Sequence, residues 1–199
     1  MSPLIETIRV YNGTPNNVAY HQRRMQRAFD ALAGGAKAPD LAGELKKIIF
    51  PIQGLFKCRV IYHEVIEHIH LEPYVIRPVA SLRLVKSDTI EYNHKFEDRR
   101  TLQKLFDQRN GCDDVLIVKQ GLITDTLYAN VIFRRGEEWL TPSAFLLAGT
   151  QRAFLLDRGI IREQKITPAD LPRFSACKLI NSMLLLEGPE IAVENIKTS

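Results

Sequence analysis

The stretch GLITDTLYANVIF, residues 121 to 133, carries a carboxylate, Asp125, in the middle of an apolar run. The run is rich in strand-forming residues, and we interpret it as a β-strand entered from a turn at Gly121. A buried carboxylate without a partner costs several kcal/mol or takes up a proton. The rest of the chain must therefore supply a cation, a hydrogen-bond donor or a ligand for Asp125.

The regions on both sides of this stretch alternate between strand and helix patterns. Apolar spacing, Asn residues as caps and glycines as stops predict a helix over 16–35, and Thr150 and Gly159 bracket a later one. The sequence therefore predicts an α+β protein with two tightly packed domains, a small one over 1–84 and a larger one over 85–199. Further predicted strands cover 4–14, 55–63, 68–76, 81–87 and 178–188, and further predicted helices cover 40–50 and the later part of 88–111.

Composition describes an ordinary globular protein of 199 residues, with 45% hydrophobic and 25% charged residues. No apolar run approaches the roughly 20 residues of a membrane span, and the N-terminus lacks a signal-peptide layout. We therefore expect a cytoplasmic protein without a membrane partner. The net charge of +4 is spread along the chain, which favours small anionic ligands and gives no basis for a nucleic-acid partner.

Two groups of residues could suggest metal or disulfide chemistry. The three cysteines are far apart and odd in number, which indicates neither a disulfide framework nor a zinc site. The segment HEVIEHIH, residues 63–70, would place His68 and His70 on one face of a strand, but no distant third ligand accompanies them. We interpret them as surface histidines and expect no metal.

Four short motifs follow one another along the chain. Each is weak alone, and together, in this order over about residues 3–185, they resemble the class IV aminotransferase family, the pyridoxal 5'-phosphate (PLP) enzymes of fold type IV. That family includes branched-chain and D-amino-acid aminotransferases and 4-amino-4-deoxychorismate lyase. The motifs are His21-x-x-Arg24, Lys95-x-x-x-Arg99, Thr124-Asp125 followed by Asn130, and Leu147-x-Gly149-x-x-Arg152.

The resemblance implies a D-amino-acid aminotransferase-like fold with the cofactor site between two domains, and a homodimer whose pockets are completed across subunits. It implies that Asp125 meets the pyridine nitrogen of PLP, so that the cofactor supplies the missing cation. Lys95 matches the lysine that binds PLP covalently and then moves the substrate α-proton. The alternative is that Lys95 is an ordinary solvated lysine. It would then stand at the predicted start of a helix, where the helix dipole disfavours cations, and this misfit favours a special role.

The same resemblance implies the residues around the cofactor phosphate. Arg24 matches the arginine that binds it, and a guanidinium suits bidentate phosphate recognition. Gly149, Thr150 and Gln151 match the loop that opens a helix at the phosphate, where backbone N–H groups favour an anion. Thr150 as a plain helix cap is compatible with this role. Ala129 lies in the other loop on the phosphate side.

Two residues bear on the reaction. Thr7 falls where aminodeoxychorismate lyases carry a threonine beside the reacting centre, and its hydroxyl could assist protonation during pyruvate elimination. The alternative is an ordinary β-branched strand residue. Arg59 is the candidate for an anionic substrate's carboxylate, because its strand resembles the one that faces the ligand; the alternative is an ion pair with a surface glutamate.

Three hypotheses for function remain open at this point. The first is a PLP-dependent lyase that converts 4-amino-4-deoxychorismate to 4-aminobenzoate and pyruvate. The second is an aminotransferase that acts on an amino acid and a 2-oxo acid. The third is a non-catalytic small-anion binding protein on a degenerate version of the fold, favoured by the absence of the family's first strand and loop before Glu6. The retention of Lys95, Asp125 and Arg24 together argues against the third.

Overall fold

The computed structural model describes residues 2–198, which fall into two compact units. Unit 1 comprises Met1–Ile76 and His94–Asp98, and unit 2 comprises Arg77–Asn93 and Arg99–Ser199. The fold is a mixed α+β fold, as predicted. Compactness does not show which segments fold independently, so the predicted domain boundary after residue 84 stays a prediction.

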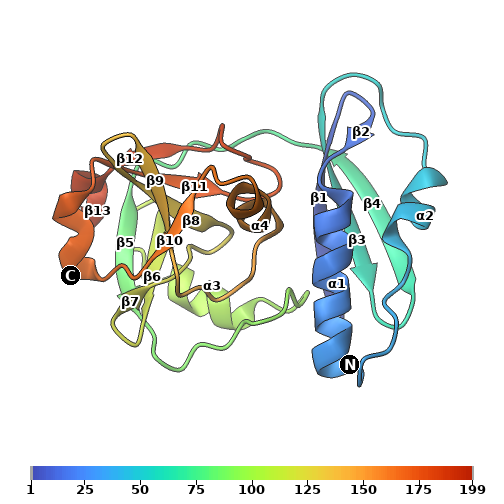
Figure 1. Cartoon of the computed structure of the whole chain (residues 1–199), viewed down its shortest axis with the longest axis horizontal. Helices are drawn as coiled ribbons and strands as arrows, with labels where there is room; N and C mark the ends of the chain where they lie inside the picture. The colour runs from blue at the N-terminus through green and yellow to red at the C-terminus, as the bar shows by residue number, and fades with distance from the viewer. Residues whose placement is uncertain (1, 199) are drawn as a thin grey trace. The chain divides into compact units, whose positions relative to one another are not determined.

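Unit 1 is an antiparallel sheet with helices packed on one face (Figure 1). The predicted turn at Asn12-Gly13 is confirmed, since both residues have positive φ angles, 47° and 81°. The turn joins the first two strands, and the strand order is β2-β1-β3-β4. The elements are β1 (Leu4–Tyr11), β2 (Thr14–Pro15), α1 (Val18–Leu32), α2 (Leu41–Lys46), β3 (Leu55–Tyr62) and β4 (Ile66–Pro73).

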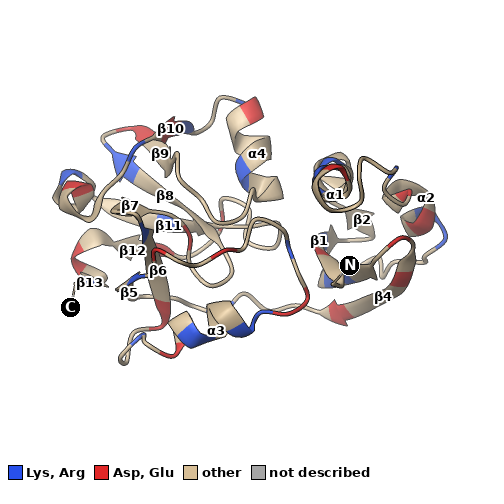
Figure 2. Ribbon diagram, turned by 90° about the horizontal axis from the view of Figure 1, so that it is seen from below, with Lys and Arg blue, Asp and Glu red and all other residues tan. Residues whose placement is uncertain are grey.

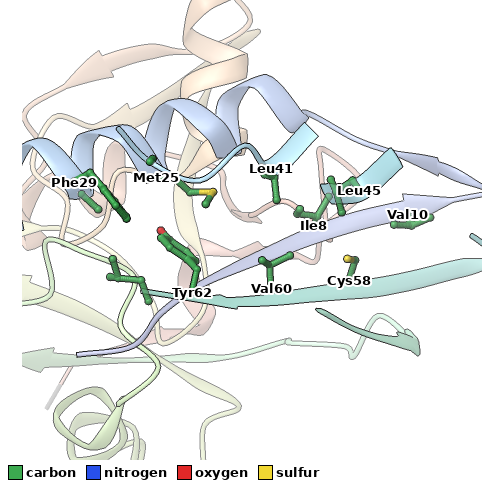
Figure 3. Packing of buried hydrophobic residues seen from close by; sticks show 12 residues of the cluster. Ile8, Val10, Met25, Phe29, Leu41, Leu45, Cys58, Val60 and Tyr62 are labelled. Carbon is green, nitrogen blue, oxygen red and sulfur yellow. The ribbon is translucent and has the colours of Figure 1, made fainter. Parts of the chain in front are cut away.

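The core of unit 1 lies between this sheet and its two helices. Alternate residues of β1, such as Ile8 and Val10, point to the helices, because side chains alternate between the faces of a strand. Met25 and Phe29 from α1 close over them, and Phe29 stacks on Tyr62 with the ring centroids 6.3 Å apart. Figure 3 shows these side chains converging from α1, α2, β1 and β3.

The predicted cap of α1, at Asn16 or Asn17, is confirmed at Asn17, although its side chain takes no part. Asn17 occupies the cap position with φ 54°, and its side chain makes no capping hydrogen bond. The backbone carbonyl of Asn17 instead accepts from the N–H groups of Tyr20 and His21, at 2.9 and 3.2 Å. The left-handed conformation, which asparagine tolerates well, turns the chain from β2 into the helix.

Unit 2 contains two sheets with short helices around them (Figure 1). One sheet has the strand order β10-β9-β8-β11-β12 and the other β13-β5-β6-β7. The strands are β5 (Leu82–Lys86), β6 (Asp114–Lys119), β7 (Leu122–Ile123), β8 (Asn130–Arg135), β9 (Glu138–Pro142), β10 (Arg162–Gln164), β11 (Ala176–Ile180), β12 (Glu190–Ala192) and β13 (Ile196–Lys197). The helices are α3 (Arg100–Phe106), α4 (Thr150–Asp157), η1 (Pro168–Arg173) and η2 (Val193–Asn195).

The stretch 121–133 is not the single strand that the sequence predicted. It consists of β7, an isolated bridge between Asp125 and Asn130, and the first residues of β8. The chain reverses between the bridge residues because the Thr126 N–H donates to the Ala129 carbonyl at 2.9 Å and the Ala129 N–H donates to Thr126 Oγ1 at 3.2 Å. Asp125 therefore stands at the entrance of a tight turn.

Charged residues are spread over the structure, as they are along the sequence. Figure 2 shows lysines, arginines and acidic residues distributed over both units, with no single basic block. Within residues 2–198, no helix is long and apolar enough to cross a membrane. The same residues contain no group of three or more His, Cys, Asp or Glu side chains arranged to hold a metal ion.

Candidate functional site

Asp125 is buried, and its carboxylate accepts three hydrogen bonds inside unit 2. Oδ2 accepts from the backbone N–H groups of Leu146 and Leu147, at 3.0 and 2.9 Å, and Oδ1 accepts from Asn130 Nδ2 at 2.9 Å. Both oxygens are thus satisfied by the chain itself. Asn130 also donates to the Leu147 carbonyl at 3.0 Å, so its amide ties Asp125 to the segment before α4.

The electrostatic state of Asp125 remains unusual despite these bonds. Burial raises the pKa of Asp125 from 3.8 to about 6, although the three N–H donors act in the opposite direction. The carboxylate is therefore ionised at neutral pH but poorly stabilised. A further cation beside it would lower its pKa, which is the role that the pyridine nitrogen was predicted to fill.

Gly149 lies against Asn130, and this contact explains the glycine. A Cβ atom at position 149 would lie 1.9 Å from Asn130 Oδ1, far inside the van der Waals distance. Because the Asn130 amide is held by Asp125 and by the Leu147 carbonyl, it has little room to move away. The sequence motif around Gly149 therefore encodes a close approach between the turn after Asp125 and the start of α4.

Thr150 and Gln151 form the first turn of α4, and both side chains are buried. Gly149 caps the helix without a side chain, so the helix begins on backbone groups. Ala129 is also buried, at the end of the turn that Asp125 opens. The structure places all of these predicted residues in unit 2, on the two segments that Asn130 joins.

Arg99 and Arg152 support these segments through contacts that the sequence did not predict. Arg99 Nη2 donates to the Leu127 carbonyl, and the Arg99 guanidinium lies 4.0 Å from the centre of the Tyr128 ring. Arg152 is buried and donates to the Pro142 carbonyl at 2.9 Å. Both were visible only as the final residues of their motifs. Their contacts indicate that they brace the turn and the loop.

Lys95 lies in unit 1, and not at the start of a helix as predicted. The helix α3 begins five residues later, at Arg100. The Lys95 backbone carbonyl instead accepts from the Ile5 N–H at 2.9 Å, and an isolated bridge joins Leu4 to Phe96. Pairing with β1 thus fixes the backbone of this segment, and the helix-dipole argument for Lys95 does not apply.

Arg24 lies on α1 with its guanidinium bound to Glu6, a buried residue of β1 that sequence reasoning overlooked. Arg24 Nε donates to Glu6 Oε1 at 2.9 Å, and Nη2 donates to Oε2 at 2.5 Å. His21 Nδ1 also lies 2.5 Å from Oε2. One signal could have identified Glu6: it is the only acidic residue among the alternating apolar positions Leu4, Ile8 and Val10.

Thr7 and Arg59 are direct neighbours on the opposite face of the same sheet. They are paired residues in the β1–β3 register, and Arg59 pairs in turn with His70 of β4. Arg59 Nη2 donates to Glu97 Oε1 at 2.8 Å, so the glutamate pair considered as the alternative to a ligand is present. The Arg59 Nε is buried and has no hydrogen-bond partner among residues 2–198. Neither observation assigns a substrate role, which stays a prediction.

Comparison with family models matches residues 97–187 to the model described as amino-transferase class IV. The matched segment contains the turn at Asp125 and the loop at Gly149, the two features that Asn130 connects. Part of the motif series, from His21 to Lys95, lies before it.

Three relatives extend the similarity. An uncharacterized protein of Haemophilus influenzae is 37% identical over 186 residues, which cover 92% of this chain and 98% of that protein. The crystal structure of a provisionally named 4-amino-4-deoxychorismate lyase from Haemophilus somnus 129pt is 34% identical, with a TM-score of 0.87 over 92% of this chain and 97% of that one. A provisionally named aminodeoxychorismate lyase of Schizosaccharomyces pombe is 42% identical over 102 residues, 45% of this chain and 44% of that protein.

Proposed function

This chain belongs to the class IV aminotransferase family, and from that premise we propose that it is a PLP-dependent lyase. Its reaction converts 4-amino-4-deoxychorismate to 4-aminobenzoate and pyruvate. In this reaction the ring carbon bearing the amino group loses its proton, the neighbouring carbon–oxygen bond breaks, and the released enolpyruvyl group takes up a proton. The atoms balance without water, an oxidant or a reductant.

The observation that carries the cofactor assignment is the state of Asp125. Its two oxygens accept three N–H donors, and yet burial raises its pKa to about 6. The three donors lower the pKa of Asp125, but they do not offset the effect of burial. A carboxylate that receives a protonated pyridine nitrogen gains the missing counter-charge, so the donor set fits PLP.

The residues proposed to hold PLP are those that the resemblance implied. Asp125 would accept from the ring nitrogen and Lys95 would bind the aldehyde carbon. Arg24 and the buried segments at Ala129 and Gly149 would bind the phosphate, with Thr150 and Gln151 presenting the N–H groups of the first turn of α4. When bound, PLP draws electrons from the carbon that bears the substrate's amino group.

The remaining steps fall to side chains of this chain. Lys95 Nζ takes the proton from the amine-bearing carbon, and the Thr7 hydroxyl donates a proton to the departing enolpyruvyl group. Arg59 binds a substrate carboxylate, since it is paired with Thr7 across β1 and β3 and keeps a buried Nε without a hydrogen-bond partner in the described chain. Support for the lyase over an aminotransferase comes from the names of two relatives and from Thr7.

The first test is the visible absorption of the protein after PLP is added and the excess is removed, with Lys95→Ala as the control. We expect an absorption band retained by the wild type and lost in the variant. The loaded protein is then incubated with 4-amino-4-deoxychorismate, and 4-aminobenzoate is measured by its fluorescence. No retained band in either protein would favour the small-anion binding protein instead.

The alternative reaction has its own readout. Incubation of the loaded protein with alanine or glutamate converts the cofactor stoichiometrically to its pyridoxamine form only if the protein is an aminotransferase. We expect no such conversion from a lyase. The proposal also includes a homodimer, which light scattering of the purified protein tests directly.

A further inference from the structure

The Glu6 carboxylate is enclosed by side chains of α1 in the core of unit 1. Glu6 and His21 are completely buried, and Arg24 is only 9% exposed. Arg24 approaches the carboxylate with two parallel N–H groups, at 2.9 and 2.5 Å, and His21 Nδ1 approaches Oε2 at 2.5 Å. Such a two-point contact fixes the plane of a guanidinium as well as its position.

Burial and neighbouring charges determine the protonation state of each group in this network. Burial alone would raise the pKa of Glu6, but Arg24 and His21 lower it to about 2. Burial lowers the pKa of His21, against the effect of Glu6 and together with that of Arg24 and Lys95. At neutral pH the network therefore contains an ionised Glu6, a cationic Arg24 and a neutral His21 that donates from Nδ1.

Further cations act on this network through their charges. Arg27 has a lowered pKa, caused first by burial and then by the charges of Arg24 and Arg23. Lys95 is close enough to affect His21. The region around Arg24 thus carries an excess of positive charge, although Glu6 neutralises Arg24 itself. This excess of positive charge favours the binding of an anion. Among these cations, Arg24 is the one that Glu6 holds at two points.

We propose that Glu6 is a positioning residue, which holds the Arg24 guanidinium in the orientation that binds the phosphate of PLP, with His21 fixing Glu6 from the other side. The inference rests on the proposed function, because it takes PLP as the ligand. A free arginine side chain samples many rotamers and loses them on binding. Glu6 has already restricted those rotamers in the folded protein, so less conformational entropy is lost when the phosphate binds.

Two substitutions separate orientation from charge. Glu6→Gln keeps the size of the side chain and removes its charge, and Glu6→Asp keeps the charge and withdraws the carboxylate by one methylene. If Glu6 only competed with the phosphate for Arg24, Glu6→Gln would bind PLP more tightly and Glu6→Asp would bind it as the wild type does. If Glu6 positions Arg24, both variants bind PLP more weakly.

The ligands are PLP and pyridoxal, which lacks the phosphate, and their dissociation constants are measured by absorption titration. We expect both variants to lose about five- to ten-fold in affinity for PLP, the range expected when one long side chain must be ordered on binding. Their affinity for pyridoxal should change by less than about two-fold, because pyridoxal does not use Arg24. Glu44→Gln, which removes an exposed carboxylate paired with Lys47 in the same unit, is the matched control.

The other outcomes overturn the inference. Equal losses for PLP and pyridoxal would mean that Glu6 only maintains the fold, and unchanged or tighter PLP binding by Glu6→Gln would mean that it does not position Arg24. Circular dichroism and pyridoxal binding show whether each variant is folded. A wild type that binds PLP more tightly than pyridoxal but forms no 4-aminobenzoate would refute the lyase proposal alone, whereas one that binds neither ligand would refute both.

Discussion

Replacement of Asp125 by asparagine should remove a pH dependence from the stability of the cofactor-free protein. In the folded protein the pKa of Asp125 is raised from 3.8 to about 6 by burial. A difference of two pKa units corresponds to about 3 kcal/mol between the ionised and protonated forms. At acidic pH the unfolding free energy of the wild type therefore contains a contribution of about this size that Asp125→Asn lacks.

The sign follows from which state keeps the proton. Between pH 3.8 and about 6 the folded protein retains a proton on Asp125 that the unfolded chain has already released. The stability that this proton contributes is complete below pH 3.8, falls as the pH rises, and is lost above about pH 6. The unfolding free energy of Asp125→Asn minus that of the wild type should therefore rise by about 3 kcal/mol across this window.

The substitution also changes the hydrogen bonding, which alters this difference in unfolding free energy by an amount that does not depend on pH. The carboxylate accepts from Leu146, Leu147 and Asn130, whereas an asparagine has one acceptor oxygen and one NH2 group. Asn130 cannot simply turn over, because its Nδ2 also donates to the Leu147 carbonyl. One donor therefore faces another, at a cost of about 1 to 3 kcal/mol that does not depend on pH. Only the change with pH tests the argument.

Urea unfolding of the cofactor-free protein measures this change. The chain has one tryptophan, Trp139 on β9, so its fluorescence reports unit 2, which contains Asp125. Titrations at several values from about pH 4 to about pH 8 give the difference curve. Glu137→Gln, which removes a carboxylate that is 97% exposed in the same unit, is the matched control. A flat curve for Asp125→Asn would refute the raised pKa.

Three other substitutions test the packing around these elements. Gly149→Ala forces a Cβ atom against Asn130 and should lower the unfolding free energy by about 1 to 3 kcal/mol, measured by urea unfolding; an unchanged value would mean that the loop yields. Arg99→Met removes the hydrogen bond to the Leu127 carbonyl, so amide exchange in that turn should accelerate, and protection equal to the wild type would contradict the bracing role. Met25→Ala leaves a cavity in the core of unit 1 and should cost about 2 to 5 kcal/mol in far-UV unfolding, whereas a loss below about 1 kcal/mol would show that α1 collapses onto the sheet.

Regular elements with strong local patterns were predictable from the sequence. The strand 55–63 and the helix 150–157 appear within a residue or two of their predicted limits, because alternation, capping and glycine stops are local signals. The short strands after residue 188 were missed. Each has only two or three residues, too few for a period to show, and their partners lie far away in the sequence.

The surroundings of the candidate site residues were less predictable. Asp125 was expected to need a cation, a donor or a ligand, and three donors are present, two of them backbone groups some twenty residues away. No local pattern identifies such partners. Lys95 was assigned to the start of a helix because apolar residues follow it with suitable spacing, but contacts with β1 hold its segment in a non-helical conformation. Non-local pairing decided both cases.

Because unit 1 consists of two separate chain segments, its composition determines where the protein can be truncated. Residues 94–98 return to unit 1 after residues 77–93 have entered unit 2, and they are held there by the hydrogen bonds from Ile5 to Lys95 and from Glu97 to Pro3. A fragment that stops at residue 76 therefore lacks the segment 94–98 that pairs with the start of β1, and with it Lys95. Any shortened version of this protein that keeps unit 1 whole must carry the chain through to Asp98, or supply 94–98 as a separate peptide.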